Sequence, residues 1–174
     1  LTTICYRLNN KNTYALEGSI FIAGAGVQWM RDKVELINSA HETENISQSK
    51  IDNDGIYIVP AFTGLGAPHW NSESRGIITG LNRNTDWKNL VRSMIESVAY
   101  QSHDLFQSMR RDGAIPKIIK VDGGMVANNW FLQFLSNILN IKVLRSSIQE
   151  TTALGVAFLA GYQLGEFKLS LIHI

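Results

Sequence analysis

The most informative part of the sequence is Val121-Asp122-Gly123-Gly124-Met125-Val126-Ala127-Asn128. The mostly β-branched run at 118–121 predicts a strand that enters this stretch, and the double glycine ends the strand. A helix then begins at Asn128 or Asn129, and residues 141–144 form another short strand. Because strands alternate with helices along the chain, we expect an α/β layer fold with some parallel strand pairing.

The same stretch is a candidate ligand site. Glycines allow a turn with positive φ and let a ligand approach where a Cβ would otherwise stand. The following helix start offers free N–H groups and a partial positive charge, which suit an anion such as a phosphate. Asn128 lies four residues past Gly124, within reach of a base or ribose over the turn. The alternative is a tight turn in which Asn128 only caps the helix.

A second candidate stretch is 18–29, where small residues interrupt an otherwise large and apolar helical pattern. Glycine in a helix costs about 1 kcal/mol relative to alanine, so Gly24 and Gly26 require a reason. Gly24 and Gln28 are four residues apart and share a helix face. That face is suited to a flat ring packed on Gly24, with Gln28 hydrogen-bonded to its edge. The alternative is close helix packing at the glycines and a solvated Gln28.

The rest of the chain predicts structural elements. Residues 63–70 are rich in glycine but lack the lysine of a P-loop. A rigid functional loop is one interpretation, and a structural loop anchored by Trp70 is the one we favour. Glu96 falls within a long predicted helix, where capping or pairing is a better interpretation than catalysis. The other expected strands are at 1–8, 56–59 and 76–81, with a short extended piece at 14–17. The other expected helices are one that begins at the N-cap Ser19, one at 34–40, one from Asp86 to Gly113 and one at 151–164.

Composition and charge exclude several classes of protein. The chain has 174 residues with 16 Lys and Arg against 15 Asp and Glu, a net charge of +1. A protein that coats nucleic acid would need a basic excess. The single cysteine, Cys5, excludes an internal disulfide, and the four histidines lack the spacing of a zinc site. Since no long apolar run or signal-peptide pattern is present, we expect a cytoplasmic protein.

Four separated stretches, 12–19, 59–70, 76–81 with 89–96, and 121–129, together resemble the C-terminal half of the FGGY carbohydrate kinases. Within that family the combination is more similar to the glycerol kinases than to the pentose kinases. Several motifs in the right order are far more specific than any one of them, and the resemblance extends from Leu1 to about Gly165.

The resemblance implies an actin-like ATPase fold, in which two RNase-H-like lobes hold a nucleotide in the cleft between them. This chain would be the C-terminal, nucleotide-binding lobe, a mixed sheet flanked by helices, over residues 1–167. Residues 168–174 do not resemble the family's continuation and would be an atypical or truncated tail.

The resemblance also implies the site. It assigns ATP or ADP contacts to Gly24, Gln28, Gly124 and Asn128, so that the two candidate stretches grip one nucleotide from two sides. It assigns no catalytic residue and no metal ligand to this chain, because Mg²⁺ is held mainly through the nucleotide and the other half of the kinase. The implied reaction converts ATP and glycerol to ADP and glycerol 3-phosphate.

The family's catalytic motifs do not occur in this sequence. In the family, an Asp-x-Gly-Thr turn, a Gly-Asp-Gln segment with the catalytic aspartate and an Arg-Glu pair for glycerol all precede the region matched here. We therefore expect this chain to be part of a kinase, inactive by itself, and the whole kinase to be a homo-oligomer. Two alternatives stay open, namely a lobe of another FGGY sugar or polyol kinase and a non-catalytic actin-like interaction domain.

Overall fold

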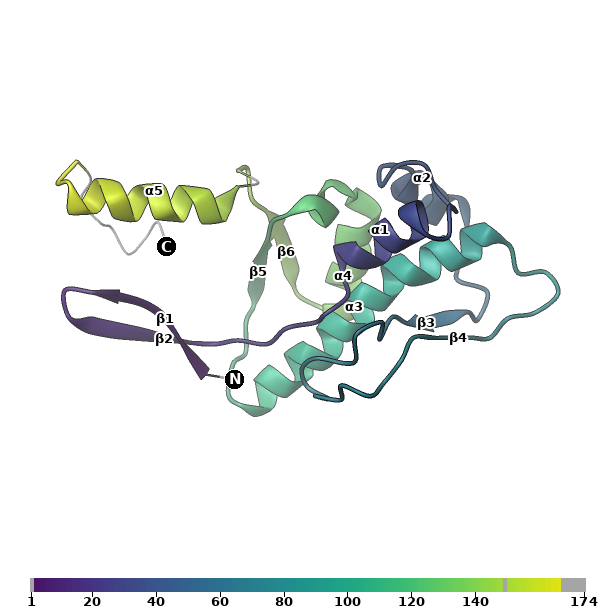
Figure 1. Cartoon of the computed structure of the whole chain (residues 1–174), viewed down its shortest axis with the longest axis horizontal. Helices are drawn as coiled ribbons and strands as arrows, with labels where there is room; N and C mark the ends of the chain where they lie inside the picture. Colours follow the sequence, from purple (N-terminus) through teal and green to yellow (C-terminus); the bar gives the residue numbers. More distant parts are fainter. Residues whose placement is uncertain (1, 149, 167–174) are drawn as a thin grey trace.

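The structure is a computed structural model that describes residues 2–148 and 150–166 (Figure 1). The predicted tail at 168–174 lies outside the described residues. The strands form three two-stranded sheets, β1 with β2, β3 with β4, and β5 with β6. The elements in chain order are β1 Thr2–Leu8, β2 Lys11–Leu16, α1 Gly24–Asp32, α2 Glu42–Ser49, β3 Tyr57–Val59, β4 Ile77–Thr79, α3 Trp87–Arg111, β5 Ile118–Val121, the 3₁₀ helix η1 Gly124–Ala127, α4 Asn129–Leu139, β6 Lys142–Arg145 and α5 Thr151–Gln163.

The 25-residue helix α3 begins where the sequence predicts. Asp86 is its N-cap, and its carboxylate accepts hydrogen bonds from the backbone N–H groups of Lys88 at 2.9 Å and Asn89 at 3.1 Å. The side chain of Asn89 accepts in return from the Asp86 N–H at 3.1 Å, which completes a capping box. Because this signal lies within four consecutive residues, the sequence alone reveals it.

The hydrophobic core surrounds α3. Helices α1, α2 and α4 pack on it, and Figure 1 shows them gathered at one end of the molecule. Gly26 explains part of the small-residue pattern in α1, since a Cβ there would stand 2.7 Å from the sulfur of Met94. The glycine therefore allows α1 to approach α3 closely. The buried core residues are Val27, Met30, Ile37, Ile46, Ile58, Val91, Met94, Ile95, Val98, Ala99, Phe131, Leu135 and Leu139.

The segment from β5 to β6 is a β-α-β unit with parallel strands. Ile118 pairs with Lys142 and Val121 with Arg145, which confirms the predicted parallel pairing. The 3₁₀ helix η1, which begins at the second of the two glycines, precedes α4, and the sequence pattern did not predict it. This unit places the turn after β5 beside the N-terminal end of α1 (Figure 1).

The β1–β2 hairpin and α5 lie at the other end of the molecule, beyond β5 and β6 (Figure 1). Asn9 and Asn10 both have positive φ, 49° and 62°, as a two-residue hairpin turn requires. The Asn9 amide donates a hydrogen bond to the Tyr162 hydroxyl at 3.1 Å and so links the hairpin to α5. Among the described residues, no helix has the length and apolarity of a membrane span.

Two predicted helix positions are wrong. The helix expected from Ser19 begins only at Gly24. The carbonyl of Ser19 instead accepts a hydrogen bond from the Ala67 N–H at 2.9 Å, because the chain before α1 runs along the glycine-rich loop. The helix expected at 34–40 forms at Glu42–Ser49, since the chain after α1 turns at Glu35 with a φ of 57°.

The predicted anchor of the glycine-rich loop is also wrong. Trp70 is 53% exposed, so burial of its ring does not hold the loop. Two backbone hydrogen bonds between Leu65 and Asn71, at 2.8 Å and 3.0 Å, close the loop instead. Backbone pairing of this kind leaves no residue-type signal in the sequence.

Candidate functional site

A cavity of about 460 Å³ lies where α1, the first turn of α2 and the turn after β5 meet. Gly24, Gln28, Gly124 and Asn128 all line it. The two candidate stretches, which are about a hundred residues apart in the chain, therefore face one space from two sides. Their contact with a nucleotide stays a prediction.

Gly24 and Gln28 form the α1 side of the cavity. Helix α1 begins at Gly24, and no side chain caps its first N–H groups within the described structure. The positive end of the helix therefore points to the cavity rim. A Cβ at Gly24 would lie 3.9 Å from the Met125 side chain, so this glycine keeps the space between α1 and η1 open. Gln28 is exposed one turn further along the same face.

The double glycine forms the opposite side. Gly123 has a φ of 86°, a conformation that residues with a Cβ rarely adopt, and it turns the chain out of β5. Gly124 opens η1, and a Cβ built there would meet no atom within 4 Å. A side chain at this position would thus project into free space rather than into the core.

Asn128 is the N-cap of α4. Its side-chain oxygen accepts a hydrogen bond from the Phe131 N–H at 2.8 Å, which confirms the capping interpretation. Its side-chain nitrogen donates to the hydroxyl of Thr43 at 3.1 Å. Asn128 also lines the cavity, so capping and ligand contact are compatible roles for this residue.

The sequence did not predict the third wall of the cavity, which is the first turn of α2 and the segment before it. Ala40, His41, Thr43 and Glu44 line it. Because the sequence pattern predicted the second helix at 34–40, it gave no role to the first turn of α2. Hydrogen bonds from Asn128 to Thr43 and from Asn129 to Glu44 join this wall to the start of α4 across 85 residues of sequence. No local pattern could have indicated them.

The ionisable residues that line the cavity are Arg31, His41, Glu44 and Asp122. The guanidinium of Arg31 pairs with the neighbouring carboxylate of Asp32, and the Arg31 Nε lies 2.6 Å from the Asp32 Oδ1. This hydrogen bond lowers the pKa of the Asp32 carboxyl. The carboxylate of Asp122 accepts a hydrogen bond from the Thr151 hydroxyl. Residues 2–148 and 150–166 contain no group of three or more potential metal ligands.

A family model for the FGGY family of carbohydrate kinases, C-terminal domain, matches residues 4–164. The chain belongs to this family. The FGGY domain described here is 53% identical over 168 residues to glycerol kinase 1 of Pseudomonas aeruginosa, covering 97% of this chain and 34% of that protein. It is 55% identical over 166 residues to a glycerol kinase of Ectopseudomonas mendocina, covering 95% of this chain and 34% of that protein. The chain thus spans about a third of the length of these relatives.

Solved structures of the FGGY family share the fold. A crystal structure of Plasmodium falciparum glycerol kinase with ADP matches with a TM-score of 0.86 at 40% identity, over 97% of this chain and 34% of that one. A ligand-bound xylulose kinase from Lactobacillus acidophilus matches with a TM-score of 0.79 at 23% identity, over 95% of this chain and 34% of that one. The expected α/β fold of the actin-like ATPases is therefore confirmed.

Proposed function

We propose that this chain is the nucleotide-binding domain of an ATP-dependent glycerol kinase. The main support for this proposal is that two stretches far apart in the sequence line a single cavity, through Gly24 and Gln28 on one side and Gly124 and Asn128 on the other. Relatives named glycerol kinase are 53% to 55% identical to it, and the similar Plasmodium falciparum enzyme was crystallised with ADP. The proposed reaction transfers a phosphoryl group from ATP to glycerol.

In this proposal the chain binds and orients the nucleotide. The cavity provides glycine-lined walls for a flat base, and the side-chain amides of Gln28 and Asn128 for hydrogen bonds at its edge. Phosphoryl transfer depends mainly on such positioning and on charge stabilisation. Mg²⁺ would enter with the nucleotide phosphates, whose charge it neutralises. The base that accepts the glycerol proton and the glycerol-binding residues would come from the part of the kinase outside the matched third.

The proposal is tested by ADP binding to the chain, measured by isothermal titration calorimetry. A Cβ at Gly124 would meet no protein atom within 4 Å, so we expect the domain to fold with Gly124→Val. We expect about five- to 150-fold weaker binding, because overpacking costs about 1–3 kcal/mol. Gly155→Val is the matched control, since a Cβ there also meets nothing within 4 Å and Gly155 is not a cavity residue. Equal ADP affinity in both variants would contradict the assigned contact.

A chimera tests the role in catalysis. The chain would replace the corresponding third of Pseudomonas aeruginosa glycerol kinase 1, to which it is 53% identical. We expect glycerol-dependent ADP release from the chimera, and a raised KM for ATP when it carries Gly124→Val. A folded chimera without glycerol-dependent turnover would argue against the proposal. Cytoplasmic location and homo-oligomeric assembly of the kinase stay predictions.

A further inference from the structure

We propose that Thr43 is a positioning residue of the nucleotide site, which fixes the orientation of the Asn128 carboxamide. This inference rests on the proposed function, because it assigns to α2 a part in the same cavity. Thr43 lies in the first turn of α2 and is only 3% exposed. It contacts Asn128 across 85 residues of sequence.

The hydroxyl of Thr43 has a defined direction. A threonine hydroxyl has one hydrogen to donate and two lone pairs. Its hydrogen is donated to the carbonyl of Ala40 at an Oγ1–O distance of 2.7 Å. Only lone pairs then remain to face Asn128, whose Nδ2 lies 3.1 Å away. The hydroxyl therefore acts as an acceptor toward the asparagine.

This direction determines which way the amide of Asn128 points. Its nitrogen must face Thr43, and its oxygen faces the Phe131 N–H at 2.8 Å. A flipped amide would set an oxygen against the Thr43 lone pairs and an NH₂ group against an N–H donor. The second Nδ2 hydrogen and the second oxygen lone pair are not used in either bond. A ligand in the cavity thus meets a fixed pattern of donor and acceptor.

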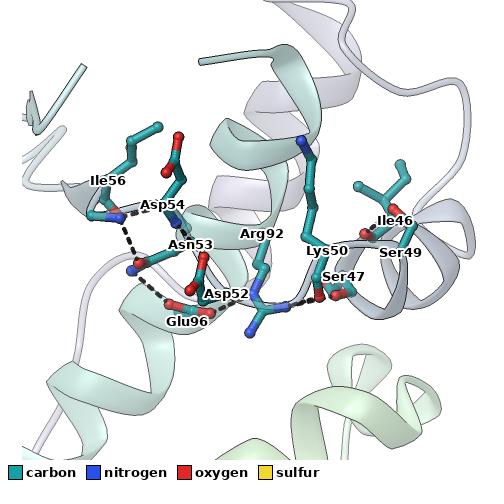
Figure 2. A network of polar contacts seen from close by, with 12 residues as sticks. Ile46, Ser47, Ser49, Lys50, Asp52, Asn53, Asp54, Ile56, Arg92 and Glu96 are labelled. Atoms are coloured by element: carbon teal, nitrogen blue, oxygen red, sulfur yellow. Dashed lines mark hydrogen bonds and ion pairs between the residues drawn. The ribbon is translucent and has the colours of Figure 1, made fainter. Parts of the chain in front are cut away.

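Helix α2 is itself held in place at both ends. At its start, the Asn129 side chain donates to Glu44 at 3.0 Å, beside the contact between Asn128 and Thr43. At its end, the buried guanidinium of Arg92 donates to the Ser47 carbonyl at 3.0 Å and to the carbonyl of Lys50 (Figure 2). Since α2 cannot shift easily, the Thr43 hydroxyl is a rigid reference for the Asn128 amide, and preorganisation of this kind strengthens binding.

Two substitutions at one position separate the hydroxyl from the shape of the side chain. Thr43→Val keeps the shape and removes the acceptor, and we expect ADP to bind about three- to tenfold more weakly, the loss of one buried hydrogen bond. Thr43→Ser keeps the hydroxyl and should restore affinity to within about twofold of the wild-type chain. Thr43→Ala removes the same hydroxyl and carries the test if the valine variant does not fold.

Ser49→Ala is the matched control. Ser49 donates to the Ile46 carbonyl at 2.7 Å, the same type of bond in the same helix as Thr43 to Ala40, but it does not line the cavity. We expect Ser49→Ala to leave ADP affinity unchanged. If Ser49→Ala weakened ADP binding as much as Thr43→Val, a general loosening of α2 would explain the effect and the proposal would be overturned.

An NMR measurement without nucleotide separates the two proposals. In the unliganded chain, we expect Thr43→Val to shift the side-chain NH₂ resonances of Asn128, while Thr43→Ser and Ser49→Ala leave them in place. Unshifted resonances, or wild-type ADP affinity in Thr43→Val, would overturn the positioning role while the effect of Gly124→Val still supported the proposed function. A wild-type chain that did not bind ADP would overturn both.

Discussion

Arg92 and Glu96 form an ion pair in the interior, between two successive turns of α3 (Figure 2). Their Nε and Oε1 atoms are 2.7 Å apart, and the residues are only 7% and 2% exposed. The second oxygen of Glu96 accepts from the Asn53 amide at 3.0 Å, and the Arg92 guanidinium lies over the Trp130 ring at 4.8 Å. The pair thus joins α3 to the loop before β3 and to α4. Of the two roles predicted for Glu96, capping and pairing, the structure confirms pairing.

Arg92→Met tests the energetic weight of this pair. The substitution leaves the carboxylate of Glu96 buried without its counter-charge, which costs about 3–5 kcal/mol in other proteins. We expect the free energy of unfolding, measured by urea denaturation, to fall by that amount. Lys50→Met is the control because it breaks the more exposed pair with Asp86, worth about 0–1 kcal/mol. Similar losses in the two variants would refute a special role for the buried pair.

Tyr100 gives a pH-dependent prediction. Burial, followed by the nearby carboxylate of Glu96, raises the pKa of the Tyr100 phenol to about 12. In the unfolded chain the phenol has a pKa of about 10. The contribution of Tyr100 to the free energy of unfolding is therefore complete below that pH and is lost as the pH rises toward about 12. Urea midpoints over this range should fall less steeply for Tyr100→Phe than for the wild-type chain. Parallel pH profiles would show that the folded phenol ionises normally.

The local pattern singled out Gly24 with Gln28, and Gly124 with Asn128, while only the family resemblance placed the two pairs at one site. All four residues line one cavity, and their contact with a nucleotide stays a prediction. Thr43 could not be found in this way, because its hydroxyl meets Asn128 only after the chain has folded. A buried threonine in a helix has the same local pattern whether or not it orients a neighbour.

Helix ends show the same division at the level of elements. The start of α3 is encoded by Asp86 and Asn89, which cap each other within one turn. The start of α1 is set by tertiary contacts. A Cβ at Gly66 would overlap the Ser19 carbonyl, so the chain there packs closely against the loop, and it becomes helical only at Gly24. Ser19 has the residue type of an N-cap but is occupied elsewhere.

The β3–β4 hairpin offers a prediction about close backbone approach. Gly80 has a φ of 83°, and a Cβ there would overlap the carbonyl of Gly55. Gly113 is the control position, because its φ is also positive, at 92°, but a Cβ there would meet no atom within 4 Å. An alanine at Gly113 therefore adds backbone strain without steric overlap. We expect Gly113→Ala to lower the unfolding free energy by about 1–2 kcal/mol, from strain alone. Gly80→Ala should cost at least about 1 kcal/mol more, from overpacking. Equal losses in thermal or urea unfolding would contradict the overlap.

At the scale of the whole molecule, burial is uneven. The helices around α3 share one core, whereas Gly161 is the only residue of α5 that is buried among those described. In the hairpin, Ile4 and Tyr14 are paired across the two strands, and they are 57% and 63% exposed. The hairpin and α5 lie together at one end of the molecule (Figure 1). This end therefore presents apolar side chains to solvent.

Exposed apolar surface of this kind favours association between molecules. Val156 and Leu159 are three residues apart on α5, share one face, and are 64% and 42% exposed. We expect the chain to self-associate with increasing concentration in sedimentation velocity, and Val156→Lys with Leu159→Lys to reduce this association. Thr152→Lys with Gln163→Lys adds the same charge to the same helix at exposed polar positions, and should have the smaller effect. Charge repulsion is matched between the two double variants, so equal effects would show that the apolar face of α5 is not the contact. A wild-type chain that stayed monomeric at every concentration would contradict the predicted self-association.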